Sequence, residues 1–219
     1  MATQEKIKKD VVDNLYWDTR IDASDIEVEI EKGQVTLKGT VPSYSARSAA
    51  ASNALSIRDV TSVVNNLTVE YPSAVTVPSD SDIKDNVESS LLWDTDIDST
   101  KIDVSVSGGI VTLEGEVDSF WKLYRAESDA DLTGVIDIVN KLAVVPTESI
   151  VDKDIAEDVV NALSRNISVN VDDVNVKVKD GKVTLTGTVP TSTASTAAEN
   201  SAYFTLGVTD VDNQLIVSY

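Results

Sequence analysis

The sequence predicts an α+β protein made of three tandem domains, each a small αββαβ sandwich. The main observation is a stretch that occurs three times, as GQVTLKGTVPS at 33–43, GIVTLEGEVDS at 109–119 and GKVTLTGTVPT at 181–191. In each copy, apolar residues with helical spacing come first. A segment in which apolar and polar residues strictly alternate then leads into the repeated stretch. Self-similarity at a nearly fixed period indicates a repeat architecture. We therefore expect domains at residues 1–71, 79–145 and 148–219.

Each copy is predicted to open with a helix that has one apolar face. In the first copy, Ile7, Val11 and Leu15 are spaced four residues apart, and Thr3 precedes them as a candidate N-cap. The same stripe recurs in the other copies as Ile83, Val87, Leu91, Ile155, Val159 and Leu163. A helix of this kind lies with its stripe on a sheet and its polar face in water.

A β-hairpin is predicted after the first helix of each copy. Ile26, Val28 and Ile30 alternate with glutamates, which is typical of a strand with one face in water. A tight two-residue turn would then pair Ile30 with Val35 and Val28 with Leu37 across the hairpin. A shift of one residue would move the whole apolar set into water, so we expect this register to be well defined.

Six glycines mark structural positions in the three hairpins. A type I′ turn needs positive φ, which glycine adopts without steric cost, so a glycine is expected at its second central position. The predicted turn glycines are Gly33, Gly109 and Gly181. The glycines that follow in the second strand are Gly39, Gly115 and Gly187, and we expect them to let a helix approach the sheet closely.

A second helix and a closing strand complete each copy. The helix is predicted from about Ser43 to Ile57 in the first copy, and it carries alanines four residues apart in all three copies, namely Ala50, Ala54, Ala126, Ala130, Ala198 and Ala202. The closing strands are predicted at 63–69, 138–144 and 211–217. Because crossover connections are right-handed, the closing strand should run parallel to the second strand. Each domain then has a three-stranded mixed sheet with two helices on one face.

The composition excludes most kinds of enzyme chemistry. The chain of 219 residues contains no cysteine and no histidine. It therefore lacks thiolate nucleophiles, imidazole bases, disulfides and the usual zinc ligands. Serine and lysine are scattered, and no base is placed beside a nucleophile. We predict that the protein is not an enzyme and that it binds no cofactor and no metal.

The charge of the chain is strongly negative. Eighteen basic and 37 acidic residues give a net charge of −19. Residues 1–72 have 8 basic and 11 acidic residues, a charge of −3, whereas 73–146 have 5 and 15, a charge of −10. Residues 147–219 have 5 and 11, a charge of −6. Such a field repels phosphate backbones, and no basic cluster interrupts it, so a nucleic-acid partner is not expected.

The beginning of the sequence, MATQEKIKKD, has no apolar region of the kind found in signal peptides. No apolar run elsewhere approaches the length of a transmembrane segment. As written, the chain is therefore expected to be cytoplasmic, or periplasmic if an exported precursor has been shortened.

A closing motif of the form VxNxL carries a family resemblance. It reads VVNNL at 63–67, IVNKL at 138–142 and VDNQL at 211–215. Together with the element order and the VTLxGxV strand, it resembles the BON domain family (bacterial OsmY and nodulation) in three tandem, OsmY-like copies. The resemblance implies a non-enzymatic protein that attaches to phospholipid membranes or envelope proteins, often in osmotic stress. The first copy has Asp59-Val60 where the others have Gly-Val, and so departs from the pattern.

Aromatic residues that differ between the copies are the best candidates for a binding surface. Trp93 has a counterpart in Trp17, but the third copy has Arg165 there. Only the second copy begins its second helix with Phe120, Trp121, Leu123 and Tyr124, where the other copies have SYSAR and TSTAS. We therefore predict a contact surface for a partner on the second domain, formed by Trp93, Phe120, Trp121 and Tyr124. The alternative is that these side chains pack against a neighbouring copy.

A run of acidic residues follows Trp93. Asp94, Asp96 and Asp98 are spaced like the start of a calcium-binding loop, but Ser99 and Ser105 replace its glycine and its bidentate glutamate. A solvated acidic turn is the preferred interpretation.

The sequence thus predicts a stress-related, non-enzymatic binding or scaffold protein that contacts a protein partner through its second domain. The alternative is peripheral association with a phospholipid membrane, as the family resemblance implies. The acidity of the aromatic-rich copy opposes that alternative, because anionic headgroups repel it.

Overall fold

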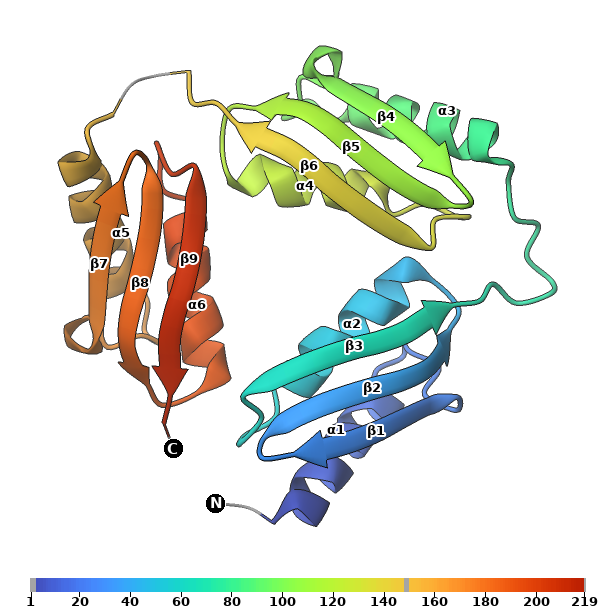
Figure 1. Ribbon diagram of the computed structural model, residues 1–219, viewed down its shortest axis with the longest axis horizontal. Coiled ribbons are helices and arrows are strands. Elements are labelled where there is room, and N and C mark those ends of the chain that lie inside the picture. The colour runs from blue at the N-terminus through green and yellow to red at the C-terminus, as the bar shows by residue number, and fades with distance from the viewer. Residues whose placement is uncertain (1–2, 148–149, 219) are drawn as a thin grey trace. The chain divides into compact units, whose positions relative to one another are not determined.

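The computed structural model describes residues 3–147 and 150–218 and has the predicted α+β architecture (Figure 1). Its three sheets have the strand orders β1-β2-β3, β4-β5-β6 and β7-β8-β9, so each sheet takes its strands from one sequence copy. In each copy the two helices cover one face of the sheet. The predicted domain limits at residues 1, 148 and 219 lie outside the described residues.

Backbone packing divides the chain into two compact units. The first extends to Ser89 and includes Val104–Thr112 and Ala130–Val139. The second consists of Ser90–Asp103, Leu113–Asp129 and the chain from Asn140 onward. The first sequence copy therefore lies in the first unit and the third copy in the second, while the second copy contributes segments to both.

The first copy has the element order αββαβ. Its elements are α1 (Gln4–Trp17), β1 (Ile26–Glu31), β2 (Gln34–Val41), α2 (Tyr44–Leu55) and β3 (Ser62–Val69). The predicted cap of α1 is confirmed, because Thr3 Oγ1 accepts a hydrogen bond from Lys6 N at 3.3 Å. Ser43 caps α2 in the same way, through a 3.1 Å bond from Ala46 N. This helix therefore begins after Ser43 and ends at Leu55, two residues earlier than predicted.

The other copies add a short 3₁₀ helix before the first strand. The second copy contains α3 (Asp80–Trp93), η1 (Ser99–Lys101), β4 (Ile102–Ser107), β5 (Ile110–Val117), α4 (Trp121–Ala130) and β6 (Asp137–Val144). The third copy contains α5 (Asp152–Arg165), η2 (Val171–Asp173), β7 (Val174–Lys179), β8 (Lys182–Val189), α6 (Ser192–Tyr203) and β9 (Asp210–Val217).

The hairpin register predicted for the first copy is confirmed. Ile30 lies opposite Val35 and Val28 opposite Leu37 in the antiparallel pair of β1 and β2. Lys32 and Gly33, with φ of 50° and 86°, form the predicted turn with two left-handed residues. The closing strand runs parallel to the second strand, in β2–β3 and in β8–β9. The apolar pattern and the turn chemistry thus fix the sheet together.

The core of each copy lies between its sheet and its helices. In the first copy, Val11, Leu15 and Leu37 are almost fully buried, as their spacing predicts. Burying a side chain of this size contributes about 2 kcal/mol. The six alanines of the second helices are all completely buried. A larger side chain at these positions would hold the helix away from the sheet.

The strand glycines have a different role from the one predicted. A Cβ on Gly39 would clash with the main-chain carbonyl oxygen of Asp25, just before β1. The same clash would occur between Gly115 and the carbonyl of Lys101, and between Gly187 and that of Asp173. The expectation that these glycines accommodate a helix is therefore wrong. They admit the turn that leads into the first strand, and all three have positive φ.

The asparagine of the VxNxL motif joins the closing strand to the second helix. Asn65 Nδ2 donates to Arg47 O in α2 at 2.9 Å, and Asn65 Oδ1 accepts from Leu67 N at 3.3 Å. Asn140 and Asn213 make the equivalent pairs of hydrogen bonds. The side chain therefore satisfies a helix carbonyl and a strand amide at once, which is a structural reason for the motif.

Candidate functional site

Trp93 is the most exposed of the predicted site residues. It is the last residue of α3, and 83% of its surface is accessible. The helix ends here because Asp94 turns the chain, with Asp94 Oδ1 accepting from Asp96 N at 2.8 Å. Leu91 points into the core, whereas Leu92 and Trp93 point away from it. The turn therefore presents two apolar side chains to solvent.

The first copy repeats this arrangement at the end of α1. Trp17 is 78% exposed, and its ring meets that of Tyr16 edge to face at a centroid distance of 5.3 Å. The side chain of Asp18 turns the chain just as Asp94 does, by accepting from Arg20 N at 3.0 Å. In the third copy the equivalent of Trp17 and Trp93 is Arg165. Since the same helix forms there, folding alone does not require a tryptophan at this position.

Trp121 and Tyr124 lie on the first turn of α4 and keep part of their surface in solvent. Trp121 is half-buried, with Lys122 Nζ 5.8 Å from the centre of its ring. Tyr124 is about half exposed, and its hydroxyl is 2.8 Å from the hydroxyl of Tyr203. Both side chains can still contact another molecule, although Tyr124 already has a hydrogen-bonding partner.

Phe120 is withdrawn from solvent. Only 7% of it is accessible, and its ring stacks on that of Tyr203 at 4.8 Å within the second compact unit. It belongs to the same buried apolar cluster as side chains of the third copy such as Ile155 and Val159. This is the alternative described above, packing against another copy. Phe120 has too little exposed surface for an external partner, and we leave it out of the surface proposed below.

Tyr203 is a residue that the sequence reasoning missed. Its hydroxyl donates its single proton to Glu199 Oε1 at 2.8 Å, so it accepts the hydrogen bond from the hydroxyl of Tyr124. Burial and these neighbours raise the pKa of Tyr203 far above its ordinary value, so the hydroxyl stays protonated. A comparison of the copies could have singled out Tyr203, because the first and second copies have Leu55 and Asp131 at this position.

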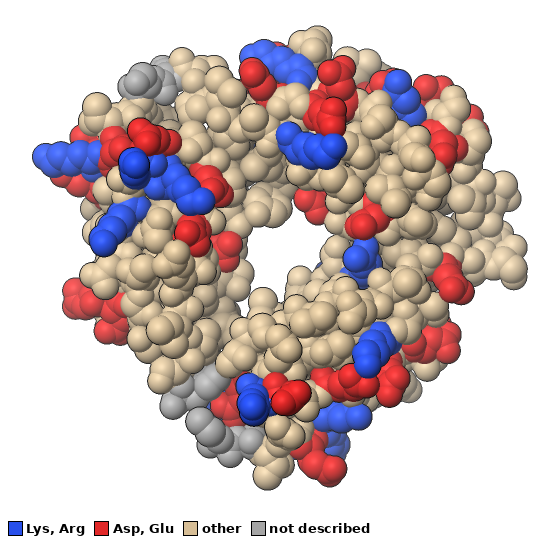
Figure 2. Space-filling view, in the orientation of Figure 1, with Lys and Arg blue, Asp and Glu red and all other residues tan. Residues whose placement is uncertain are grey.

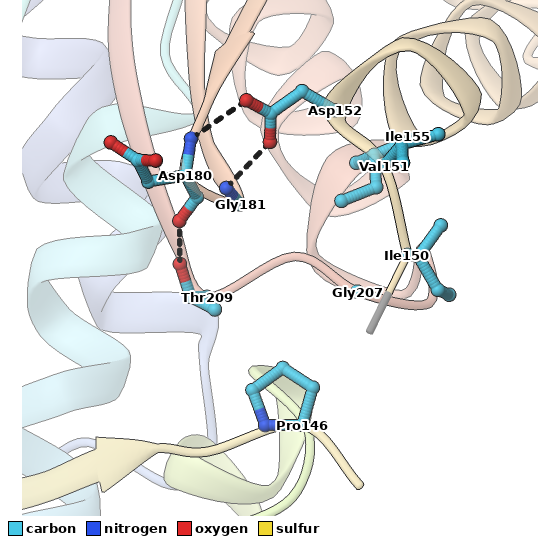
Figure 3. A pocket seen from close by; sticks show the side chains of 9 residues that line it. All are labelled: Pro146, Ile150, Val151, Asp152, Ile155, Asp180, Gly181, Gly207 and Thr209. Atoms are coloured by element: carbon cyan, nitrogen blue, oxygen red, sulfur yellow. Dashed lines mark hydrogen bonds between the residues drawn. The ribbon is translucent and has the colours of Figure 1, made fainter. Parts of the chain in front are cut away.

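A pocket with a volume of about 680 Å³ lies beside the hairpin turn of the third copy (Figure 3). Its polar groups bond to one another. Asp152, at the start of α5, accepts from the amides of Asp180 and Gly181, each at 2.9 Å. Asp80 makes the same pair of bonds to Gly108 and Gly109 in the second copy. The aspartate thus ties the helix to the hairpin turn, which is a structural function.

Acidic and basic side chains are mixed on the face that Figure 2 draws, where carboxylates are interspersed with lysine and arginine. In the predicted acidic turn, Asp98 accepts from Thr100 N and Thr100 Oγ1. Among the described residues, no group of three or more acidic side chains is arranged to hold a metal ion. In the same part of the chain, no helix is long and apolar enough to cross a membrane.

The fold and the repeated motifs agree with a match to a family model. The BON domain model matches three times, at residues 3–71, 79–146 and 151–219, and the chain therefore belongs to the BON domain family. This match covers nearly the whole sequence. The features common to the three copies, the turn glycines and the motif asparagine among them, are thus features of a family fold.

A named relative is similar to this chain over much of its length. Osmotically-inducible protein Y from Escherichia coli (strain K12) is 32% identical over 145 residues, which covers 64% of this chain and 70% of the relative. Among solved structures, the C-terminal domain of CdsD, a structural protein of the type III secretion system of Chlamydia trachomatis, aligns over 100% of both chains at 15% identity. Its TM-score is 0.28.

Proposed function

We propose that this chain is a non-enzymatic binding or scaffold protein of the osmotic stress response, and that it contacts a protein partner through its second domain. The observation that carries the proposal is the exposure of Trp93, which is 83% accessible at a position where the third copy has Arg165. The name of the E. coli relative, osmotically-inducible protein Y, supports the stress setting.

The physical argument rests on the energetics of an exposed tryptophan. A large apolar side chain in water contributes little to stability, whereas tryptophan is enriched among residues that dominate protein–protein binding energy. Leu92, 70% exposed beside it, enlarges the apolar surface. Trp121 and Tyr124 are further candidates on the same domain. The surface that we propose therefore consists of Leu92, Trp93, Trp121 and Tyr124.

Peripheral lipid association is the second candidate function, and the first copy favours it more than the second does. Tyr16 and Trp17 are exposed there, and the helix that carries them also contains Lys6, Lys8 and Lys9. Tryptophan and tyrosine suit the headgroup region, and basic residues suit anionic lipids. The second copy is more acidic, with 5 basic and 15 acidic residues over 73–146 against 8 and 11 over 1–72.

The protein-partner function is tested by capture on the immobilised full chain from extracts of salt-stressed host cells. Replacing Trp93 by Ala should weaken capture of a specific partner by about thirty-fold, since a central tryptophan is worth about 2 kcal/mol. The matched control is Arg165→Ala, which changes the equivalent position of the third copy and should not alter capture. If both variants retain the same partners as the wild type, Trp93 is not the contact residue.

The lipid function is tested by sedimentation with vesicles. The full chain is mixed with neutral phosphatidylcholine vesicles and with vesicles that also contain phosphatidylglycerol, each at low and high salt. If the chain binds a protein partner and not lipid, we expect no protein in the pellet. Sedimentation that Trp17→Ala abolishes and Trp93→Ala does not would favour lipid association through the first domain.

A further inference from the structure

Two carboxyl groups face each other in the second domain. Asp94 follows Trp93 at the end of α3, and Asp129 lies in the last turn of α4. Their side chains are only 5% and 16% exposed, respectively. Asp94 is close enough to Asp129 to raise the pKa of the Asp129 carboxyl. Arg125 forms an ion pair with Asp94, and its Nε lies 3.9 Å from Asp129 Oδ1.

The donors around this pair are too few for two ionised carboxylates. Asp94 accepts from Asp96 N and from Arg125 Nε, so its own oxygens are satisfied. Asp129 Oδ2 is buried and accepts no hydrogen bond from any described residue. Ionised carboxylates only accept hydrogen bonds, so neither can satisfy the other. A proton on Asp129 would supply the missing donor.

In each sister domain, one of the two equivalent positions carries a hydrogen-bond donor that reaches the other. In the first copy the pair is Asp18 and Asn53, with Asn53 Nδ2 donating to Asp18 Oδ2 at 2.5 Å. In the third copy Asn166 Nδ2 lies 3.2 Å from Ser201 Oγ. The fold therefore connects these two positions by a hydrogen bond in each sister copy. Only the second copy must recruit a proton to make the same connection.

We propose that Asp94 and Asp129 share a proton in mildly acidic solution, and that this shared proton fastens the end of α3 to α4 in the second domain. As the solution approaches neutrality the proton leaves, and the connection between the two helices weakens. The pH of the solution thereby determines how firmly Asp94, the residue next to Trp93, is held.

The charged groups around the pair give the direction of the effect. The charged groups next to it are Arg125 from α4 and Asp96 from the turn after α3, which acts on Arg125. Burial first, and then Asp94, raise the pKa of Asp129 from its ordinary 3.8 to about 6, while Arg125 opposes the shift. Hydrogen bonds from Asp96 N and Arg125 lower the pKa of Asp94. The folded domain thus binds a proton that the unfolded chain releases, and stability falls as pH rises from 3.8 to about 6.

The proposal is tested on the full chain by carbon NMR of the aspartate side-chain carboxyls across a pH titration. The expected result is one carboxyl with a midpoint near pH 6 that disappears in Asp129→Asn, a change that imitates Asn53 of the first copy. The control is Asp103→Asn, which removes an exposed carboxylate from β4 and should leave that midpoint in place. If every aspartate in the wild type titrates below about pH 4.5, or if the midpoint persists in Asp129→Asn, the proposal is overturned.

A second measurement uses Trp93 as a reporter and does not depend on assigning the carboxyls. The chain has three tryptophans, so Trp17→Phe with Trp121→Phe leaves Trp93 alone. Its fluorescence anisotropy should fall as pH rises from about 5 to about 7, because the turn that follows it loosens. The same background with Asp129→Asn should show no such step. A step that is unchanged by Asp129→Asn would contradict the proposal.

Discussion

Replacement of the motif asparagine of the first copy by alanine should destabilise the domain far more than the same change at its neighbour. Asn65 is half-buried and bonds to a carbonyl of α2 and to an amide of its own strand. Asn66 is exposed on the other face of β3. The two substitutions remove the same atoms from adjacent positions, so their difference isolates the hydrogen bonds.

The magnitude follows from the two hydrogen bonds that Asn65→Ala removes. Leu67 N loses its side-chain acceptor in a partly buried place, which costs about 1 to 3 kcal/mol, and the second bond, to Arg47 O inside α2, contributes about 1 kcal/mol. Some water can reach these groups, so we expect a loss of about 2 to 3 kcal/mol in the free energy of unfolding. Asn66→Ala should change it by less than about 0.5 kcal/mol.

The assay is calorimetric unfolding of the full chain, combined with hydrogen exchange to locate the destabilised segment. For a domain of this size, 2 to 3 kcal/mol corresponds to a fall in melting temperature of about 10 °C or more. Protection should be lost in α2 and β3 of the first copy. Equal effects of Asn65→Ala and Asn66→Ala would refute the structural explanation of the motif.

Three further predictions concern the second domain. Gly115→Ala should lower its stability by about 3 kcal/mol or more in thermal unfolding, because the new Cβ meets a main-chain carbonyl. The control is Gly108→Ala, whose new Cβ has nothing within 4 Å and should cost about 1 kcal/mol. Asp129→Asn should raise the free energy of unfolding near pH 7.5 by about 1 to 2 kcal/mol, after allowing for solvent screening, and by little near pH 4. Urea unfolding at the two pH values measures both gains. Equal gains would contradict the coupling between stability and the protonation of Asp129. Trp121→Ala should leave the melting temperature nearly unchanged while weakening partner capture, and a large drop would instead assign Trp121 to packing.

The fold could be predicted from the sequence because each local signal is repeated and points the same way. The alternation of Ile26, Val28 and Ile30, the turn glycine Gly33 and the buried alanines all act over a few residues, where steric rules decide the outcome. The role of Gly39 was predicted incorrectly. Its neighbour is the carbonyl of Asp25, fourteen residues earlier, and sequence spacing contains no information about that approach.

The candidate site was only partly accessible from the sequence. The difference between Trp93 and Arg165 was visible, and it indicated a side chain that folding does not need. Whether an aromatic residue is exposed depends on tertiary packing, which separates Trp93 from the buried Phe120. Asp94 and Asp129 are 35 positions apart in the sequence, and the tertiary fold brings them together. The comparison with Asn53 becomes informative once that contact is known.

The central claim is that the residues shared by the three copies build the fold, while exposed aromatic residues that the third copy lacks, Trp93 above all, bind the partner. Its most direct test is photo-crosslinking in the host cell, with a benzophenone amino acid placed at position 93 of the full chain and, separately, at position 165. We predict a discrete protein adduct from Trp93 that is absent or much weaker from Arg165. Equal adducts from both positions, or none from position 93 under osmotic stress, would contradict the claim.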